Sequence, residues 1–380
     1  MKRKKLVIIS HTEHYKNHEQ KIVGWGSTVN ELNFLADYWE EIVHIGCLYK
    51  TEAPKSALPY SQKNIQFVAL PPYGGKSILS KIGILFKIPV IIYTVLKNIK
   101  NATEVQLRLP TSMGLFLLPL FSFFLPRKYT FWVKYAGNWQ QENPPISYKI
   151  QRSWLFKNFS KSKVTINGFW ENQPKHCLSF ENPCLTDEDI TKGKEIIETK
   201  NFSAKFNLCF VGRLDDAKGV AVILNSLQKI DLNLIEKIHF IGDSEKRNYY
   251  ETKASFLGNK VTFHGFLDKE NVHNLLKNAH FLLLPSKSEG FPKVIAEAAC
   301  YGAIPIVSNV GSISHYVNPE NGFLWCINGS IGFEEILEKA LLEDKRMLEK
   351  KAINLSYLAE KFTFTNYIHK LNIKILKITV

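Results

Sequence analysis

The sequence has few cysteines for its length, and their spacing excludes several classes of protein. Its 380 residues contain six cysteines, and no two of them form a C-x-x-C pair or a zinc-binding spacing. Several stand in apolar, strand-like stretches, where a free thiol behaves as a small hydrophobic side chain. The sequence therefore predicts neither a disulfide framework nor a zinc site, and it favours the reducing environment of the cytoplasm.

A long apolar run is also missing. The most apolar segment, residues 113–126, contains Pro119 and falls short of the roughly twenty residues that span a bilayer. The basic N-terminus, MKRKK, is followed by an apolar stretch that is too short for a signal peptide. We therefore expect a cytoplasmic protein without a membrane span, which can lie peripherally at the inner face of the membrane.

Two kinds of motif are absent. No G-x-G-x-x-G follows the first strand expected in either half of the chain, which argues against a nicotinamide-dependent oxidoreductase. No D-x-D-like element points to a bound metal ion, and we expect Asp215 and Asp216 to be solvated surface residues. The sequence therefore predicts no metal cofactor.

Positive charge is unevenly distributed. The net charge is +14, of which residues 1–190 carry +10 and the remainder +4. A basic first half suggests a polyanionic partner, either an acidic membrane surface or a phosphorylated substrate. No RNA- or DNA-reading motif accompanies it, so we do not expect nucleic acid. The segment Lys76–Lys100 is basic and amphipathic, as interfacial helices are, although a helix that covers the sheet would fit the same pattern.

Strand-like and helix-like segments alternate along the chain, and the pattern restarts after residue 200. Such alternation predicts parallel sheets in doubly wound α/β layers. The expected strands are 5–10, 42–46, 65–69, 104–109, 130–133 and 164–167, then 207–211, 237–241, 260–264, 281–285 and 304–308. The main helices are expected at 29–41, 220–230, 245–256, 271–278, 294–301 and 333–342. We predict an N-terminal domain over 1–182, a C-terminal domain over 183–362, and a tail helix over 363–380 that crosses back to the N-terminal domain.

Two motifs stand directly after expected strands of the second half. The first, FVGRLDDAKG at residues 210–219, combines Gly212, Arg213, Lys218 and Gly219. An arginine fork and a lysine point charge suit a diphosphate, although two solvated cations in an ordinary turn would give the same pattern.

The second motif is SEGFPKVIAEA at residues 288–298. Pro292 suits the first position of a helix, whose exposed amides and positive dipole end favour an anion. Glu289 precedes this helix, and Glu297 lies about a turn inside it in apolar surroundings. A partly buried acid needs a partner, which the two hydroxyl groups of a ribose would supply, unless Glu297 caps or forms a local ion pair.

These motifs, with VTFHGFL, AACYGAIPIVSNVGSI and ENGFL in the same order, resemble the C-terminal domain of glycosyltransferase family 4. The resemblance covers roughly residues 205–325 and includes the E-x7-E element of Glu289 and Glu297. It implies the GT-B fold, in which two Rossmann-like doubly wound α/β domains face each other across a cleft. It also implies a retaining transferase that uses a nucleotide-diphosphate sugar, of UDP or GDP type, without a metal ion.

The resemblance assigns roles to individual residues. It implies that Arg213 and Lys218 hold the diphosphate, that Glu297 binds the ribose, and that Glu289 faces the donor sugar. These assignments make Glu289, Arg213 and Lys218 the expected catalytic residues. The full expected donor site comprises Gly212, Arg213, Lys218, Gly265, Phe266, Glu289, Gly290, Phe291, Pro292, Lys293 and Glu297.

The chain departs from the family pattern in two places. The loop after the last strand reads Gly311-Ser312-Ile313-Ser314-His315, where the family commonly has Gly-Gly and then Glu, so we expect a local structural change there. The N-terminal domain lacks the family's frequent cleft histidine. In that domain His11, Gly26, Arg108 and Asn138 are weaker candidates for acceptor binding, each with a structural role as the alternative.

The sequence thus predicts a glycosyltransferase that moves a hexose-type sugar to a saccharide or lipid-linked saccharide. Surface polysaccharide synthesis, of capsule or lipopolysaccharide, is the setting that this class implies. Two alternatives remain open at this point. A GT-B isomerase or phosphorylase would share the architecture, and a non-catalytic sugar-nucleotide binder would bind the donor without turning it over.

Overall fold

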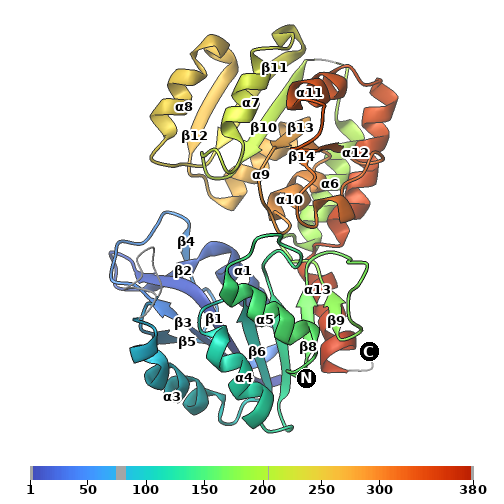
Figure 1. Ribbon diagram of the computed structural model, residues 1–380. Coiled ribbons are helices and arrows are strands. Elements are labelled where there is room, and N and C mark those ends of the chain that lie inside the picture. The colour runs from blue at the N-terminus through green and yellow to red at the C-terminus, as the bar shows by residue number, and fades with distance from the viewer. Residues whose placement is uncertain (1–2, 74–82, 204, 378–380) are drawn as a thin grey trace. The chain divides into compact units, whose positions relative to one another are not determined.

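The computed structural model describes residues 3–73, 83–203 and 205–377 (Figure 1). The chain forms two compact units. The first comprises Met1–Phe180 together with Ile368–Val380, and the second comprises Glu181–Tyr367. Each unit contains its own sheet and its own hydrophobic core.

The sheet of the first unit is mainly parallel. Its strands run in the order β5-β3-β1-β6-β7-β8-β9. Strand β2 pairs antiparallel with β1, and β4 pairs antiparallel with β2. The order places β1 in the middle of the sheet, as in Rossmann-like folds. The strands are β1 (Arg3–Lys16), β2 (Ile22–Trp25), β3 (Trp39–Leu48), β4 (Ala57–Pro59), β5 (Ile65–Leu70), β6 (Glu104–Leu109), β7 (Thr130–Tyr135), β8 (Lys163–Ile166) and β9 (Cys177–Ser179).

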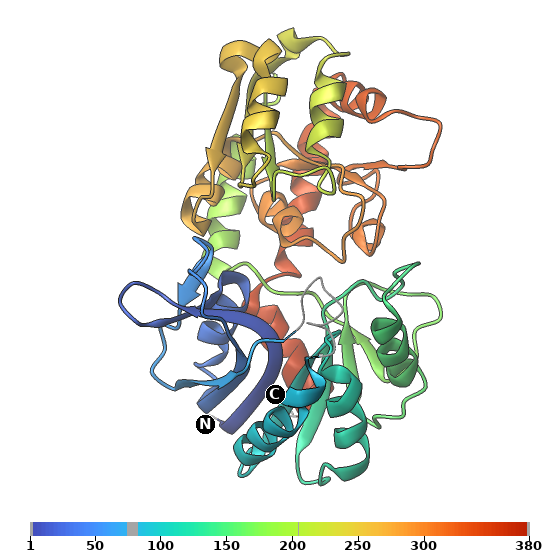
Figure 2. The same cartoon turned by 60° about the vertical axis from the view of Figure 1, so that its left-hand side comes forward.

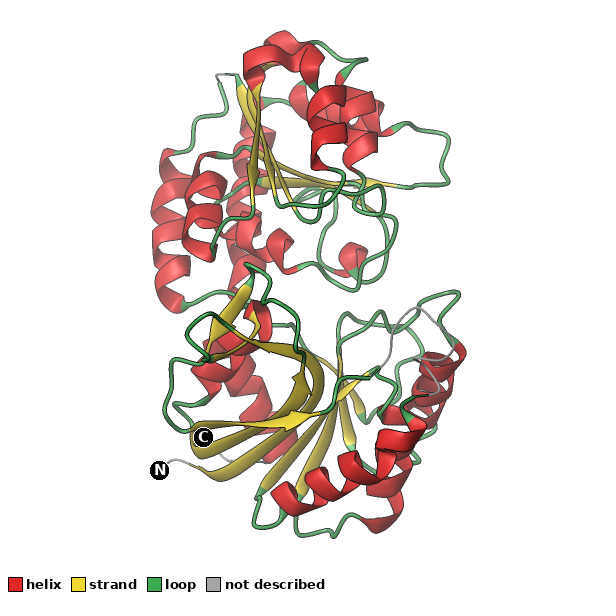
Figure 3. Cartoon of the chain, turned by 90° about the vertical axis from the view of Figure 1, so that its left-hand side faces the viewer, coloured by secondary structure: helices red, strands yellow, loops and turns green. Residues whose placement is uncertain are grey.

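Helices cover both faces of this sheet, because the central strands are apolar on both sides (Figure 3). One face carries α3 (Ile88–Ile99), which follows the short η1 (Leu85–Lys87), and also α4 (Gly114–Phe124) and α5 (Ile146–Phe156). The other face carries α1 (Gly26–Leu35). In α3 the residues Ile91, Val95 and Ile99 are buried at helical spacing against the core of this unit.

The C-terminal segment returns to the first unit. Helix α13 (Phe364–Leu371) begins in the second unit, and the π-helical η5 (Asn372–Leu376) that follows contacts β7 (Figure 2). Ile375 is buried there.

The second unit is a six-stranded parallel sheet in the order β12-β11-β10-β13-β14-β15. Helices α6, α9, α10 and α12 pack together on one side, and α7, α8 and α11 on the other. The strands are β10 (Phe206–Val211), β11 (Ile235–Ile241), β12 (Val261–Gly265), β13 (Phe281–Leu284), β14 (Ile304–Ser308) and β15 (Phe323–Trp325). The helices are α6 (Asp187–Thr199), α7 (Val220–Leu227), α8 (Arg247–Lys253), α9 (Lys269–Asn278), α10 (Lys293–Cys300), α11 (Phe333–Leu341) and α12 (Lys345–Glu360), with short 3₁₀ turns η2 (Leu232–Leu234), η3 (Ser255–Lys260) and η4 (Ile313–His315).

The two Rossmann-like layers that the sequence predicts are confirmed. Two expected elements of the first unit are wrong in extent. The helix expected over 29–41 ends at Leu35, because Trp39 already begins β3. The first strand does not end at Ser10: β1 continues through a bulge after Ile9 and stays paired with β3 as far as His14. Part of the segment Lys76–Lys100 lies outside the described residues.

Within the described part of the chain, no helix combines the length and the apolarity that a membrane crossing requires.

Candidate functional site

The second sheet reverses its strand order between β10 and β13. From β10 the chain proceeds to β11 and β12 on one side, and β13 then starts the other side of the sheet. The loops that follow β10 and β13 therefore diverge at the carboxyl edge of the sheet. Ligands of open α/β sheets bind at such a switch point. Both motifs singled out in the sequence follow these two strands.

Main-chain contacts hold the two loops together. The amide of Lys287 donates a hydrogen bond to the carbonyl of Ala217 at 2.8 Å. Gly219, at φ +82°, lies so close to the second loop that a Cβ there would stand 2.3 Å from the carbonyl oxygen of Pro285. Only glycine fits this approach, and the loop at 213–219 is thereby fixed against the loop at 285–289.

Lys218 and Glu289 meet where these loops join. The Lys218 Nζ atom lies 2.5 Å from Glu289 Oε1, and the side chains are 32% and 10% exposed respectively. The carboxylate of Asp215 accepts a hydrogen bond from the Lys218 amide at 2.8 Å and so orients the loop. An anionic ligand at Lys218 would compete directly with Glu289 for the ammonium group. The two residues expected to hold phosphate and donor sugar are thus brought together.

Arg213 lies apart from this contact. Its side chain is 70% exposed, and Nε pairs with Asp215 Oδ2 at 2.5 Å. The expectation that Asp215 is a solvated surface residue is wrong, because its side chain is 16% exposed and bonds both Arg213 and the Lys218 amide. Asp216 is 47% exposed, as expected of a surface residue, and accepts a 2.7 Å hydrogen bond from Tyr250.

The loop after β14 contacts the backbone carbonyls of Glu289 and Gly290. The Ser312 amide and hydroxyl both donate to the Gly290 carbonyl, at 2.9 and 3.0 Å. Gly311 has φ +58°, and a Cβ there would stand 1.9 Å from the Glu289 carbonyl oxygen. Sequence reasoning missed the role of Ser312, whose hydroxyl makes a bond that the family's usual second glycine lacks. His315 lies in η4, half-buried, and burial lowers its pKa.

Helix α10 spans Lys293–Cys300, close to the expected range 294–301, but Pro292 does not occupy the first helical position. Pro292 is its N-cap with extended backbone, and Lys293 is the first helical residue. Glu297 is partly buried, and burial raises the pKa of its carboxyl group against the opposing effect of Lys269 and Lys293. Among the described residues, no hydrogen bond or ion pair to the side-chain carboxyl group of Glu297 occurs. This carboxyl group therefore has capacity for a ligand.

The other expected donor residues fall into two groups. Gly212 follows β10 and donates its amide to the Ile241 carbonyl at 2.9 Å, and Gly265 ends β12 and accepts a hydrogen bond from the Gly242 amide at 2.8 Å. Phe266, directly after β12, is 40% exposed. The side chain of Phe291 instead belongs to the core, stacked 4.6 Å from Phe362 between ring centroids, so only its backbone is available to a ligand.

The four candidates in the first unit have structural partners. His11 lies inside β1, its ring 4.5 Å from that of Tyr73, and burial lowers its pKa. The Gly26 amide donates to the Ser56 carbonyl at 3.2 Å at the start of α1. Asn138 closes a turn by accepting a hydrogen bond from the Gln140 amide at 3.0 Å.

Arg108, the fourth candidate, belongs to a buried charge cluster. Its guanidinium lies 2.9 Å from Glu31, which also pairs with Lys134 at 2.7 Å. All three side chains are nearly inaccessible, with exposed fractions of 11%, 4% and 7%. A buried carboxylate that satisfies two cations is costly to break, by about 3–5 kcal/mol when one partner is removed. Arg108 therefore has a structural partner that accounts for its position.

Sequence reasoning also missed a chain of buried polar groups in the first unit. The Tyr60 hydroxyl lies 2.6 Å from His44 Nδ1 and 2.7 Å from His14 Nε2, and Ser10 Oγ lies 2.7 Å from His44 Nε2. Burial lowers the pKa of His14 to about 4 and that of His44 well below its usual value, so both rings are neutral at physiological pH. No local spacing connects these residues, because strand pairing alone brings them together.

Comparison with known proteins finds a family match within the second unit. Residues 192–361 match the family model of glycosyl transferases group 1. The relatives include an N-acetyl-D-galactosaminyltransferase of Campylobacter jejuni, 28% identical over 190 residues that cover 49% of this chain and 50% of the relative. An uncharacterized glycosyltransferase of Methanocaldococcus jannaschii is 32% identical over 120 residues, 31% of each chain. The chain spans half or less of the length of these curated relatives.

Solved structures support the fold over the whole chain. Sucrose-phosphate synthase of Thermosynechococcus elongatus superposes with a TM-score of 0.68 at 15% identity, covering 97% of this chain and 98% of that one. The Anabaena protein Alr3699/HepE in complex with UDP gives 0.68 at 16% identity, covering 99% and 100%. The architecture is that of the GT-B fold.

The raised pKa of Glu297 leads to a prediction about stability. A carboxyl group whose pKa is higher in the folded than in the unfolded chain destabilises the fold once the pH exceeds the folded pKa. Both states are protonated below the ordinary glutamate pKa of about 4.3, so the penalty disappears there. We expect Glu297→Gln to raise the melting temperature at pH 7 and to leave it unchanged at pH 4 or below.

Thermal denaturation of wild type and variant across this pH range measures the effect. Glu338→Gln, which removes a carboxylate from an exposed position on α11, is the matched control. It should change the melting temperature neither at pH 7 nor at pH 4. If the Glu297→Gln variant is less stable than wild type at pH 7, the ionised Glu297 carboxylate does not destabilise the fold and the raised pKa is wrong.

Proposed function

We propose that the protein is a retaining glycosyltransferase that moves a hexose-type sugar from a nucleotide-diphosphate sugar to a saccharide acceptor. The contact between Lys218 and Glu289 at the switch point carries this proposal, because it joins a phosphate-binding cation to a residue that faces the donor sugar. The match of residues 192–361 to glycosyl transferases group 1 supports it. A UDP complex of a structural neighbour supports a nucleotide-sugar donor.

The proposed chemistry follows from these groups. The bond between the sugar C1 atom and the phosphate oxygen breaks, and the nucleoside diphosphate leaves with its negative charge. The acceptor hydroxyl forms a bond to C1 on the same face, and its proton passes to the leaving phosphate oxygen. Lys218, Arg213 and the first amides of α10 stabilise the charge on the leaving group, without a metal ion. Glu297 binds the ribose hydroxyls.

Arg213 joins this site by moving. Its exposed side chain pairs with Asp215, so an arriving diphosphate can attract the guanidinium at the cost of this surface ion pair. Such an exposed pair contributes about 0–1 kcal/mol, less than a charge-assisted bond to phosphate.

Nucleotide binding tests the donor site. We expect one of UDP, GDP, ADP and dTDP to bind in a calorimetric titration, and both Lys218→Ala and Glu297→Ala to weaken it tenfold or more, about 1.4 kcal/mol. Lys339→Ala, at an exposed position on α11, is the control and should bind as wild type does. If no nucleotide binds at millimolar concentration, the donor-site assignment is wrong.

Product analysis with the sugar form of that nucleotide separates the alternatives. A new glycosidic bond of retained anomeric configuration supports the transferase. An altered free sugar would indicate an isomerase or phosphorylase, and binding without turnover of any acceptor would indicate a sugar-nucleotide binder.

Ser312 yields a further prediction. Removing its hydroxyl leaves the Gly290 carbonyl with one hydrogen bond, and such a bond is worth about 0.5–1.5 kcal/mol. We expect Ser312→Ala to reduce kcat/KM for the donor roughly two- to tenfold, because the Gly290–Phe291 peptide, next to Glu289, becomes less fixed. Ser356→Ala removes a comparable buried hydroxyl from α12, bonded to the Ile353 carbonyl at 2.7 Å, and should leave donor kinetics unchanged. Equal kinetics in both variants would contradict the positioning role.

The acceptor is proposed to be a saccharide carried on a lipid, in the synthesis of a surface polysaccharide such as capsule or lipopolysaccharide. The Campylobacter relative is named for transfer to an undecaprenol-diphosphate-linked saccharide. The neighbour WaaG is described as involved in lipopolysaccharide biosynthesis. Such an acceptor would bring the enzyme to the cytoplasmic face of a membrane.

Helices of the first unit carry the apolar surface that membrane docking requires. Phe86, Val90 and Tyr93 are 84%, 53% and 67% exposed before and along α3, opposite its buried stripe. Phe123 and Phe124 at the end of α4 are 70% and 75% exposed. The charge of +10 on residues 1–190 would attract anionic lipid to the same unit.

Vesicle sedimentation tests this docking. We expect the protein to bind vesicles that contain phosphatidylglycerol at low salt, and Phe123→Ser/Phe124→Ser to reduce the bound fraction at least threefold. The control Leu342→Ser/Ile353→Ser removes exposed apolar groups from the second unit and should bind as wild type does. Equal binding by the Phe123/Phe124 variant, or none by wild type, would exclude this surface.

A further inference from the structure

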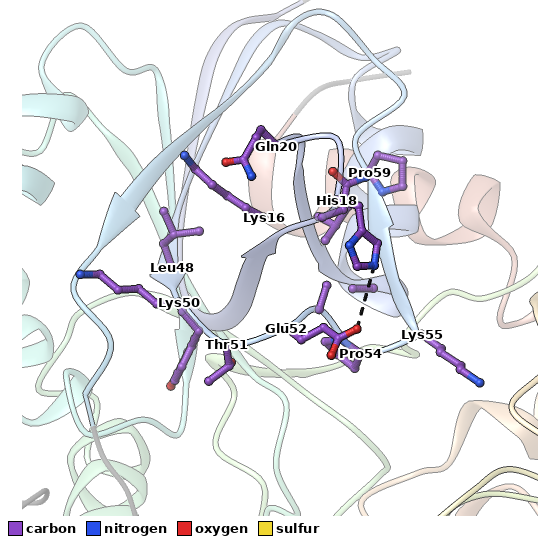
Figure 4. Close-up of a pocket in the computed structure, with 15 residues that line it drawn as sticks. Lys16, His18, Gln20, Leu48, Lys50, Thr51, Glu52, Pro54, Lys55 and Pro59 are labelled. Atoms are coloured by element: carbon purple, nitrogen blue, oxygen red, sulfur yellow. Dashed lines mark ion pairs between the residues drawn. The ribbon is translucent and has the colours of Figure 1, made fainter.

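A pocket in the first unit is lined by none of the candidate site residues considered so far. Its cavity volume is about 1040 Å³, comparable with that of small-molecule sites (Figure 4). It is formed by the turn between β1 and β2, the end of β3, the loop after β3, and β4. No part of the donor site described above contributes to it.

The unusual length of β1 creates this pocket. The pairing of β1 with β6 ends at Ile9, yet β1 continues to Lys16, which pairs back with Ile22 of β2. Strand β4 then pairs with β2 through Val23 and Pro59. An antiparallel extension is thus added to the parallel sheet, and it gives the pocket walls of hydrogen-bonded backbone.

The turn at the end of β1 is also well defined. The Asn17 side chain accepts hydrogen bonds from the amides of Glu19 and Lys21, at 3.1 and 2.9 Å. The Asn17 amide donates to the Lys21 carbonyl at 3.0 Å. These bonds hold the pocket wall that presents Lys16, His18 and Gln20.

Positive charge surrounds the pocket. Lys16 and Lys50 extend on one side of it with Leu48 between them, and Lys55 lies on the other side (Figure 4). One carboxylate, Glu52, is present among the lining residues, 4.0 Å from His18 Nε2. Three ammonium groups and one carboxylate leave an excess of positive charge, which favours an anionic occupant.

The remaining lining residues suit a sugar. Val23, Leu48 and Pro59 offer apolar surface for the C–H face of a pyranose ring. Gln20 and Thr51 offer an amide and a hydroxyl for the ring hydroxyls. Burial raises the pKa of Tyr49, which also lines the pocket, to about 12, so its phenol keeps its proton as a hydrogen-bond donor.

We propose that this pocket binds an acidic saccharide, a sugar that carries a phosphate or carboxylate group paired with Lys16 and Lys50. The identification of this saccharide as part of the acceptor rests on the proposed function. The proposal that the pocket binds an acidic saccharide does not rest on it, because the pocket shares no residue with the donor site.

Calorimetry on the full chain tests the inference with four probes: glucose 6-phosphate, glucuronate, glucose and inorganic phosphate. We expect at least one acidic sugar to bind at least tenfold more tightly than glucose and than inorganic phosphate. The two acidic sugars distinguish recognition of a phosphate from that of a carboxylate. If inorganic phosphate binds as tightly as the acidic sugars, the pocket does not recognise a saccharide. If glucose binds as tightly, the pocket does not require an anionic group. If neither acidic sugar binds, both parts of the proposal are wrong.

Variants tie the binding to the pocket. Lys16→Ala/Lys50→Ala should weaken binding of the acidic sugar at least tenfold and leave nucleotide binding unchanged. Lys339→Ala/Lys350→Ala removes the same charge from exposed positions on α11 and α12 and should change neither. If both double variants lose the same affinity for the acidic sugar, the binding reflects the general positive charge of the protein and the proposed site is wrong. Acidic-sugar binding in a wild type that binds no nucleotide would overturn the proposed function alone.

Discussion

The ion pair between Lys218 and Glu289 is the interaction on which the candidate site depends. It joins the loops that follow β10 and β13, where the strand order of the second sheet reverses. Gly219 permits the loops to touch, and Gly311 and Ser312 fix the peptide beside Glu289. The cation and the acid therefore occupy one place because neighbouring parallel strands end at the same edge of the sheet. A diphosphate that reaches this edge meets a charge already positioned, and preorganised charge is the main means by which such a site can stabilise a leaving group.

Much of the second unit could be predicted from the sequence, because its signals are local. Strands of three to seven residues alternate with helices, and glycines and charged residues stand in the loops after β10, β11 and β13. The joining of Lys218 to Glu289, 71 residues apart, follows from the rule that ligands bind at the carboxyl edge of a parallel sheet. One error here is small: Pro292 caps α10 instead of starting it.

The first unit was harder to predict, because its distinctive features come from pairing between distant segments. The extension of β1 to Lys16 depends on β2, β3 and β4, and none of these contacts has a sequence period. Burial of Arg108 and Lys134 around Glu31 brings together three elements, and the histidine–tyrosine chain brings together β1, β3 and the loop after β4. The same residue types at exposed positions would give the same sequence pattern as these buried ones. Only tertiary structure distinguishes an ion pair that supports the fold from one that binds a ligand.

A crystal structure of the protein with its preferred nucleoside diphosphate tests the central claim most directly. The account predicts the diphosphate between Lys218 and the first turn of α10, the ribose hydroxyls within hydrogen-bonding distance of Glu297, and the Lys218 ammonium turned from Glu289 toward phosphate. A nucleotide bound elsewhere on the chain, or one that leaves Glu297 without a ligand contact, would contradict it.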